Sequence, residues 1–116
     1  MALPKKEKLK DRRVFRNTRR LQNISKNKYF RLIGQSLHHA VSGNSPLVSF
    51  VISKKKLKSA VKRNRSKRRM EEAYRSSKEV LTNQLSQFKY LIFFLEAESL
   101  EANFQTLKKQ IISSFK

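Results

Sequence analysis

The residues of this chain best suited to chemistry lie in residues 54–69, where basic side chains surround the uncharged amide of Asn64. This segment holds ten basic residues and no acid, so it carries half of the net charge of +20. On a helix, Asn64, Arg65 and Arg68 would be neighbours on one face. An arginine guanidinium binds phosphate in bidentate fashion, and an asparagine amide can hydrogen-bond a base edge or a ribose 2′-hydroxyl. Contact with RNA is therefore the chemistry that this segment favours.

The charge of the chain is divided into two blocks. Residues 1–31 carry +10 and residues 54–69 carry another +10, whereas residues 32–53 have no charged side chain. A field this positive attracts a polyanion, and without one it repels itself in the compact state. An acidic membrane surface would also require a broad apolar face beside the basic one. Because residues 54–69 offer only three small or aliphatic side chains for such a face, nucleic acid is the favoured partner.

Groups that could make this chain a hydrolase are sparse. Such an enzyme needs acids, a histidine base or metal ligands placed together, and the eight acids here are scattered. His38 and His39 are adjacent, so in a strand they would point to opposite faces. The absence of cysteine excludes disulfides and cysteine-ligated zinc, and it fits a reducing compartment. We expect no catalytic residue and no metal ligand in this chain.

The length of 116 residues fits one domain covering residues 1–116. We expect its first ten residues to be mobile. No apolar run of the kind needed for a signal peptide follows the basic N-terminal block. The longest apolar run, residues 90–95, is far shorter than the roughly 20 residues of a membrane helix. The sequence therefore predicts a soluble protein of the cytoplasm.

The first half of the chain is predicted to form a short helix and two strands. Asp11 can cap a helix whose apolar face includes Phe15, which suits either the core or a wall that faces RNA. Residues 29–35 alternate loosely as a strand with a bulge or bend at Gly34, and residues 47–53 alternate as a second strand. Because turn-forming residues lie between these strands, we expect an antiparallel pair.

The second half is predicted to contain the basic helix, a buried strand and a final helix. Ser59 is a good N-cap for a helix from residue 60 to about residue 81. Residues 90–95 are apolar throughout, as in a strand buried on both faces at the centre of a sheet. The order of strand, helix and strand predicts a crossover with parallel pairing. Ser99 can cap the final helix, with Glu101 in its first turn and an apolar stripe that would cover the sheet.

The motif around the basic helix is similar to the signature of a known family. Ile52-Ser-Lys-Lys is followed by Ala60-Val-Lys-Arg-Asn-Arg-Ser-Lys-Arg and then by Glu72-Ala-Tyr-Arg. This pattern closely resembles that of the bacterial ribonuclease P protein component, and the resemblance extends over nearly the whole chain. It implies an α/β (α+β) sandwich of the ribosomal protein S5 domain 2-like kind, with about four strands packed by helices. The crossover would be left-handed, against the general rule.

The resemblance also implies a function. In the family, a catalytic RNA subunit removes the 5′ leader of precursor tRNA by metal-dependent hydrolysis, and the protein assists. The chain would then be a subunit of the ribonuclease P holoenzyme, an endoribonuclease that leaves a 5′-phosphomonoester on the mature tRNA. Its partners would be the catalytic RNA and precursor tRNA, with no membrane and no small-molecule substrate. No cofactor would bind the protein alone, and the holoenzyme would require magnesium.

The site residues follow from the same resemblance. The expected leader cleft contains Phe15, Arg12 and Arg19. Positions that match cleft aromatics of the family hold Arg19 and Ile33 here, and Glu71 stands where the family often has a basic residue. The loop before the basic helix lacks the usual glycine. The expected RNA-binding residues are Lys54, Lys55, Arg63, Asn64, Arg65, Lys67 and Arg68.

Two other functions share some of these features. A structural ribosomal protein that binds rRNA without an enzymatic role would have the same charge, size and lack of cysteine. A DNA-binding regulator would be equally basic, but the chain has no helix-turn-helix spacing and no zinc pattern. The Arg63-Asn64-Arg65 motif after the paired lysines favours the ribonuclease P subunit.

Overall fold

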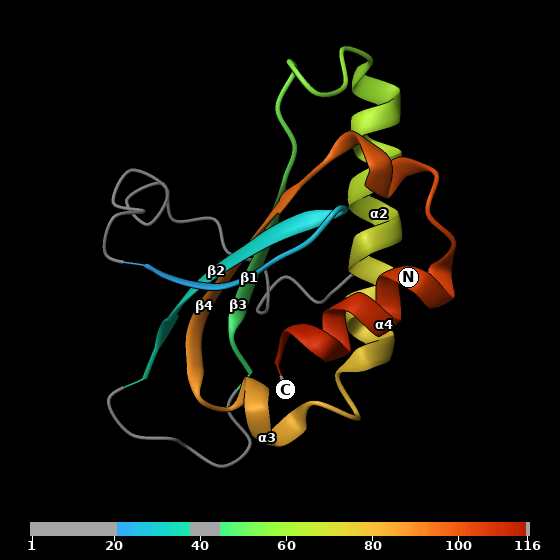
Figure 1. Cartoon of the computed structure of the whole chain (residues 1–116). Coiled ribbons are helices and arrows are strands. Elements are labelled where there is room, and N and C mark those ends of the chain that lie inside the picture. Colours follow the sequence, from blue (N-terminus) through green and yellow to red (C-terminus); the bar gives the residue numbers. More distant parts are fainter. Residues whose placement is uncertain (1–20, 38–44, 116) are drawn as a thin grey trace.

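The computed structural model describes residues 21–37 and 45–115 of the chain (Figure 1). Within these residues four strands form one sheet in the order β1-β2-β4-β3, and the helices pack on it. This is the α+β sandwich that the resemblance implies, and the hand of its crossover stays a prediction. The elements in chain order are β1 (Gln22–Lys26), β2 (Phe30–Ser36), β3 (Leu47–Val51), α2 (Ala60–Ser77), α3 (Thr82–Leu85), β4 (Phe88–Leu95), the 3-10 turn η3 (Ala97–Leu100) and α4 (Phe104–Ser114).

Strand β4 occupies the centre of the sheet. It pairs antiparallel with β2 and parallel with β3, so β3, α2 and β4 form the predicted crossover unit. Leu91, Ile92 and Phe93 have no exposed surface, although alternate residues of a strand point to opposite faces. The prediction of a central strand buried on both faces is therefore confirmed.

The remaining strands correct two predictions. Strands β2 and β3 run in opposite directions, but they do not form the expected pair because β4 lies between them. Strand β1 was not predicted, since its sequence contains a single apolar residue, Ile24, and gives no alternating signal. The pairing of β1 with β2 shifts between Asn23 and Ser25, and that of β2 with β4 shifts after Gln35. Gly34 itself pairs regularly, so the bulge expected there is wrong.

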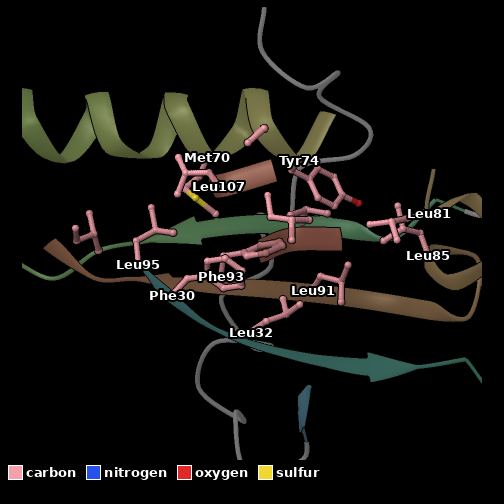
Figure 2. Packing of buried hydrophobic residues seen from close by; sticks show 14 residues of the cluster. Phe30, Leu32, Met70, Tyr74, Leu81, Leu85, Leu91, Phe93, Leu95 and Leu107 are labelled. Atoms are coloured by element: carbon pink, nitrogen blue, oxygen red, sulfur yellow. The ribbon is translucent and has the colours of Figure 1, made fainter. Parts of the chain in front are cut away.

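The main core lies between the sheet and the helices α2 and α4 (Figure 2). The ring of Phe93 is stacked on that of Phe50, with centroids 5.1 Å apart, and it meets Phe30 and Tyr74 edge-on at 5.3 and 5.8 Å. Within the described part of the chain, no helix is long and apolar enough to cross a membrane. The apolar patch predicted on α2 is confirmed, since Met70, Ala73 and Tyr74 are buried in this core.

Helix α2 begins where the sequence predicts and ends earlier. The Ser59 hydroxyl accepts a hydrogen bond from the Lys62 amide at 3.3 Å, which confirms the N-cap. The helix ends at Ser77 rather than near Leu81. The reason is that Leu81 and Leu85 turn into the core from the segment that contains α3.

The final helix begins later than predicted. Its N-cap is Asn103, whose side-chain oxygen accepts from the Thr106 amide at 2.8 Å, and not Ser99. Ser99 is instead buried in η3, and the exposed Glu101 lies between η3 and α4 rather than in the first helical turn. The apolar stripe of this helix still covers the sheet, because Leu107 and Ile111 are fully buried.

Gly34 marks a close approach of strands, and Gly34→Ala tests it. A Cβ at this position would lie 2.7 Å from the Tyr90 carbonyl oxygen and 2.9 Å from the side chains of Ile24 and Leu91. Since a backbone carbonyl cannot yield without spreading β2 from β4, we expect the free energy of unfolding to fall by about 1–3 kcal/mol. Urea denaturation measures this, with Gln35→Ala at the exposed neighbouring position as control. Equal stability of the two variants would contradict the steric argument.

Candidate nucleic-acid interface

The outer face of α2 brings together the three residues predicted to face phosphate. Because Met70 and Tyr74 point into the core, the opposite face of the helix points to solvent. Asn64, Arg65 and Arg68 are all exposed there. They line one hollow of about 370 Å³ together with Val61, Arg69 and Glu72.

The segment before α2, residues 54–58, is here called the lysine loop. Lys54, Lys55 and Lys56 are exposed in a turn, in which the amides of residues 56 and 57 donate to the Ser53 carbonyl at 3.1 and 3.2 Å. The guanidinium of Arg63 closes this loop by donating to the carbonyls of residues 57 and 58, both at 2.8 Å. Arg63 was predicted to contact RNA, and in this structure it positions the loop that presents the lysines. The helix thus holds the loop without the glycine usual in the family.

Two polar contacts fix α2 against the connection between β4 and α4. The hydroxyls of Ser66 and Ser99 are buried and lie 2.5 Å apart. Ser99 also donates to the Glu96 carbonyl at 2.7 Å, and Arg69 donates to the Ala102 carbonyl. These contacts could not be predicted from the sequence, because a serine and an arginine within a basic run look like part of a solvated face. Together they set the rotation of α2 and so the direction of its exposed arginines.

A second basic surface lies on the face of the sheet opposite α2. Strand alternation places Ile33 and Ile92 on this face, where Phe94 packs against them in a cluster separate from the main core. The Arg31 guanidinium lies 5.0 Å from the centroid of the Phe94 ring. Arg31 and Phe94 line a hollow of about 460 Å³, here called the sheet-face hollow. Its lining residues are Lys26, Arg31, Val51, Ser53, Lys56, Phe94, Leu95 and Glu96.

The residues of the sheet-face hollow were missed by the sequence analysis. Arg31 and Phe94 are far apart in the chain and meet only because β2 and β4 pair in that register. Ile33, which matches an aromatic of the family cleft, is buried on the same face with 3% of its surface exposed. The predicted cleft residues Phe15, Arg12 and Arg19 lie outside the described residues, as do His38 and His39.

The electrostatics of both surfaces are dominated by basic groups. In the sheet-face hollow, Lys56 forms an ion pair with Glu96, with Nζ 2.5 Å from Oε1. Lys67 on α2 is half-buried beside the exposed arginines.

In residues 21–37 and 45–115, no three histidine, cysteine or acidic side chains converge as metal ligands would. What these arrangements offer is binding of phosphate and of exposed bases.

Comparisons with known proteins agree with this geometry. The family model described as Ribonuclease P matches residues 3–116. The RNase P protein from Thermotoga maritima superposes with a TM-score of 0.72 at 20% identity, covering 95% of this chain and 96% of that chain. A Staphylococcus aureus RNase P protein mutant with defective mRNA degradation activity gives 0.69 at 16% identity, covering 95% and 86%. The comparison with curated proteins gave no match.

The role of Arg63 in holding the lysine loop can be tested with Arg63→Met, which keeps the aliphatic stem and removes the donors. We expect faster amide hydrogen exchange at residues 56 and 57, because the loop opens more often when its two carbonyls lose their partner. Hydrogen-exchange mass spectrometry or NMR measures this. Arg65→Met is the matched control, since it removes the same charge from an exposed site. Loop exchange that rises equally in both variants would show that Arg63 does not hold the loop.

Proposed function

The chain belongs to the bacterial ribonuclease P protein family, and from this premise we propose that it binds the catalytic RNA subunit and the 5′ leader of precursor tRNA. In the holoenzyme it assists the endonucleolytic removal of the leader, which gives the mature tRNA 5′ end. Catalysis belongs to the RNA subunit and its magnesium ions, and the protein supplies binding and orientation. The complex works in the cytoplasm.

The observation that carries this proposal is the exposed face of α2. Two arginines, Arg65 and Arg68, and the amide of Asn64 surround one hollow. Arginine forks suit phosphate oxygens, and the amide suits a 2′-hydroxyl or base edge, which is the combination that structured RNA presents. Because the rotation of α2 is fixed by Ser66 and Arg69, the direction of its exposed face is set before RNA arrives. Such preorganisation lowers the entropy lost on binding.

The lysine loop extends this surface toward the sheet. Lys54 and Lys55 are exposed at the N-terminal end of α2, where the helix dipole adds its own attraction for anions. We therefore assign them, together with the α2 arginines, to one basic surface for the RNA subunit. This surface contains five exposed members of the predicted RNA-binding set, namely Lys54, Lys55, Asn64, Arg65 and Arg68.

The sheet-face hollow supports binding of the leader. Single-stranded nucleic acid is bound by basic groups that track the backbone and by aromatic rings on which bases stack. Lys26 and Arg31 supply the charge, and Phe94 supplies a ring on the same sheet face. This ring stands close to Ile33, where the family would have an aromatic. The leader would then run over the sheet face and past the lysine loop.

The function is tested by cleavage at low magnesium. We expect the purified protein to restore multiple-turnover cleavage of precursor tRNA by a bacterial ribonuclease P RNA at a magnesium concentration where the RNA alone is nearly inactive. The protein alone should cleave nothing. A polylysine of equal charge is the control for unspecific screening of phosphates. Restoration by polylysine but not by the protein, or cleavage by rigorously purified protein without RNA, would overturn the proposal.

The α2 face is tested with Arg65→Ala. Removal of one charge-assisted contact should weaken assembly with the RNA subunit by about 1–3 kcal/mol, measured by filter binding or fluorescence anisotropy. The melting temperature should stay close to that of the wild type, because the side chain is exposed. Lys109→Ala removes an exposed charge from α4 and serves as control. Unchanged RNA affinity with a lowered melting temperature would make Arg65 a structural residue instead.

A further inference from the structure

The sheet-face hollow contains one acid among its basic lining residues. Lys26, Arg31 and Lys56 contribute positive charge, and Glu96 contributes the carboxylate. The carboxylate is paired with Lys56, and the two side chains keep 32% and 39% of their surface exposed, respectively. A surface built only to attract phosphate would gain nothing from this acid, so its place in the hollow needs a reason.

The backbone of Glu96 is held from several sides. Its amide donates to the Tyr29 carbonyl at 2.8 Å, at the point where β4 ends beside β2. Its carbonyl accepts from the amide of Ser99 at 3.0 Å and from the hydroxyl of Ser99 at 2.7 Å. Since Ser99 is in turn bonded to Ser66 on α2, the carboxylate has a fixed origin between the two basic surfaces. Glu96 therefore carries its carboxylate from a fixed backbone position at the hollow.

We propose that Glu96 is a specificity-determining residue that biases the sheet-face hollow toward unpaired RNA and against the phosphates of a double helix. This inference rests on the proposed function, because it concerns the hollow assigned to the leader. Glu96 acts in two ways, by repelling phosphate and by keeping Lys56 neutralised.

The first effect depends on what the RNA presents. A duplex hides its bases and presents rows of phosphates, which the carboxylate repels. An unpaired strand can turn a base toward Phe94 and keep its phosphates near Lys26 and Arg31. The base edge carries N–H groups, and a carboxylate oxygen accepts hydrogen bonds from such donors. Glu96 thus disfavours binding of duplex RNA more than binding of an unpaired strand.

The second effect concerns Lys56. A half-exposed ion pair is worth little, so RNA can replace the carboxylate at Lys56 at small cost. When an RNA phosphate takes the place of the carboxylate at Lys56, however, Glu96 is left unpaired close to the negatively charged RNA. A strand anchored by stacking on Phe94 can offset that loss, whereas a duplex that touches the hollow only through phosphates cannot. Lys56 therefore becomes available mainly to the ligand that also provides a base.

The experiment compares two RNA probes with the full chain, an unstructured 12-nucleotide strand and a 12-base-pair duplex. In Glu96→Gln we expect duplex affinity to rise about two- to five-fold, the range for one exposed charge pair, and the affinity for the single strand to change less. The duplex salt dependence should also steepen by about one phosphate contact. Contacts made by α2 are the same in the wild type and in Glu96→Gln. A change in the ratio of single-strand to duplex affinity therefore reports on the hollow.

Glu98→Gln is the matched control, because it removes an exposed acid two residues away that is not in the hollow. Equal changes in the ratio of single-strand to duplex affinity in Glu96→Gln and Glu98→Gln would mean that only net charge matters, which would overturn the proposal. Lys56→Gln adds a second readout. It should change duplex binding little in the wild type and should reduce the gain in Glu96→Gln, because part of that gain comes from the release of Lys56. If Lys56→Gln lowered duplex affinity equally in the wild type and in Glu96→Gln, Glu96 would not restrain Lys56.

The outcome separates this inference from the proposed function. If the wild type supports cleavage at low magnesium and Glu96→Gln behaves like Glu98→Gln, only the inference fails. If the wild type does not support cleavage but the ratio of single-strand to duplex affinity still falls in Glu96→Gln, only the assignment to ribonuclease P fails.

Discussion

The packing of Tyr74 on α2 against Phe93 on β4, with ring centroids 5.8 Å apart, is the contact on which both candidate surfaces depend. It decides which side of α2 is buried, and so it directs Asn64, Arg65 and Arg68 to solvent. It also decides which side of β4 belongs to the main core. Phe94, the next residue, must then point to the other face of the sheet, where Arg31 lies against it.

The basic character of α2 works against the folded chain. Its first turn contains no acid and follows a run of lysines, so positive side chains gather at the positive end of the helix dipole. The fold offsets this by burial of the inner face and by contacts in which side chains of the basic run donate to backbone carbonyls. Arg63 closes the lysine loop and Arg69 reaches the Ala102 carbonyl. The unfavourable charge that remains lowers the stability of the free protein. In the proposed function an RNA backbone would relieve this repulsion, so the same charge would favour binding.

The sequence predicted the elements whose signals are local. The Ser59 cap and the unbroken apolar run of β4 each depend on neighbouring residues, and the structure confirms both. Strand β1 escaped prediction because it has almost no apolar pattern. The start of α4 was predicted at Ser99, whereas the cap is Asn103, because a serine before an apolar stripe is also a common N-cap. The α2 face was predicted from helical spacing. The sheet-face hollow could not be predicted from the sequence, because Arg31 and Phe94 meet only through the pairing of β2 with β4.

The two surfaces are also connected mechanically. Glu96 borders the sheet-face hollow, its carbonyl accepts from Ser99, and the Ser99 hydroxyl contacts Ser66 on α2. This short chain of bonds runs from one candidate surface to the other through the interior rather than across a loop. The separation of the two surfaces is therefore set by packed elements, which do not deform continuously. In the proposed holoenzyme, a fixed separation would let the protein hold the leader at a constant distance from the catalytic RNA while neither surface takes part in the chemistry.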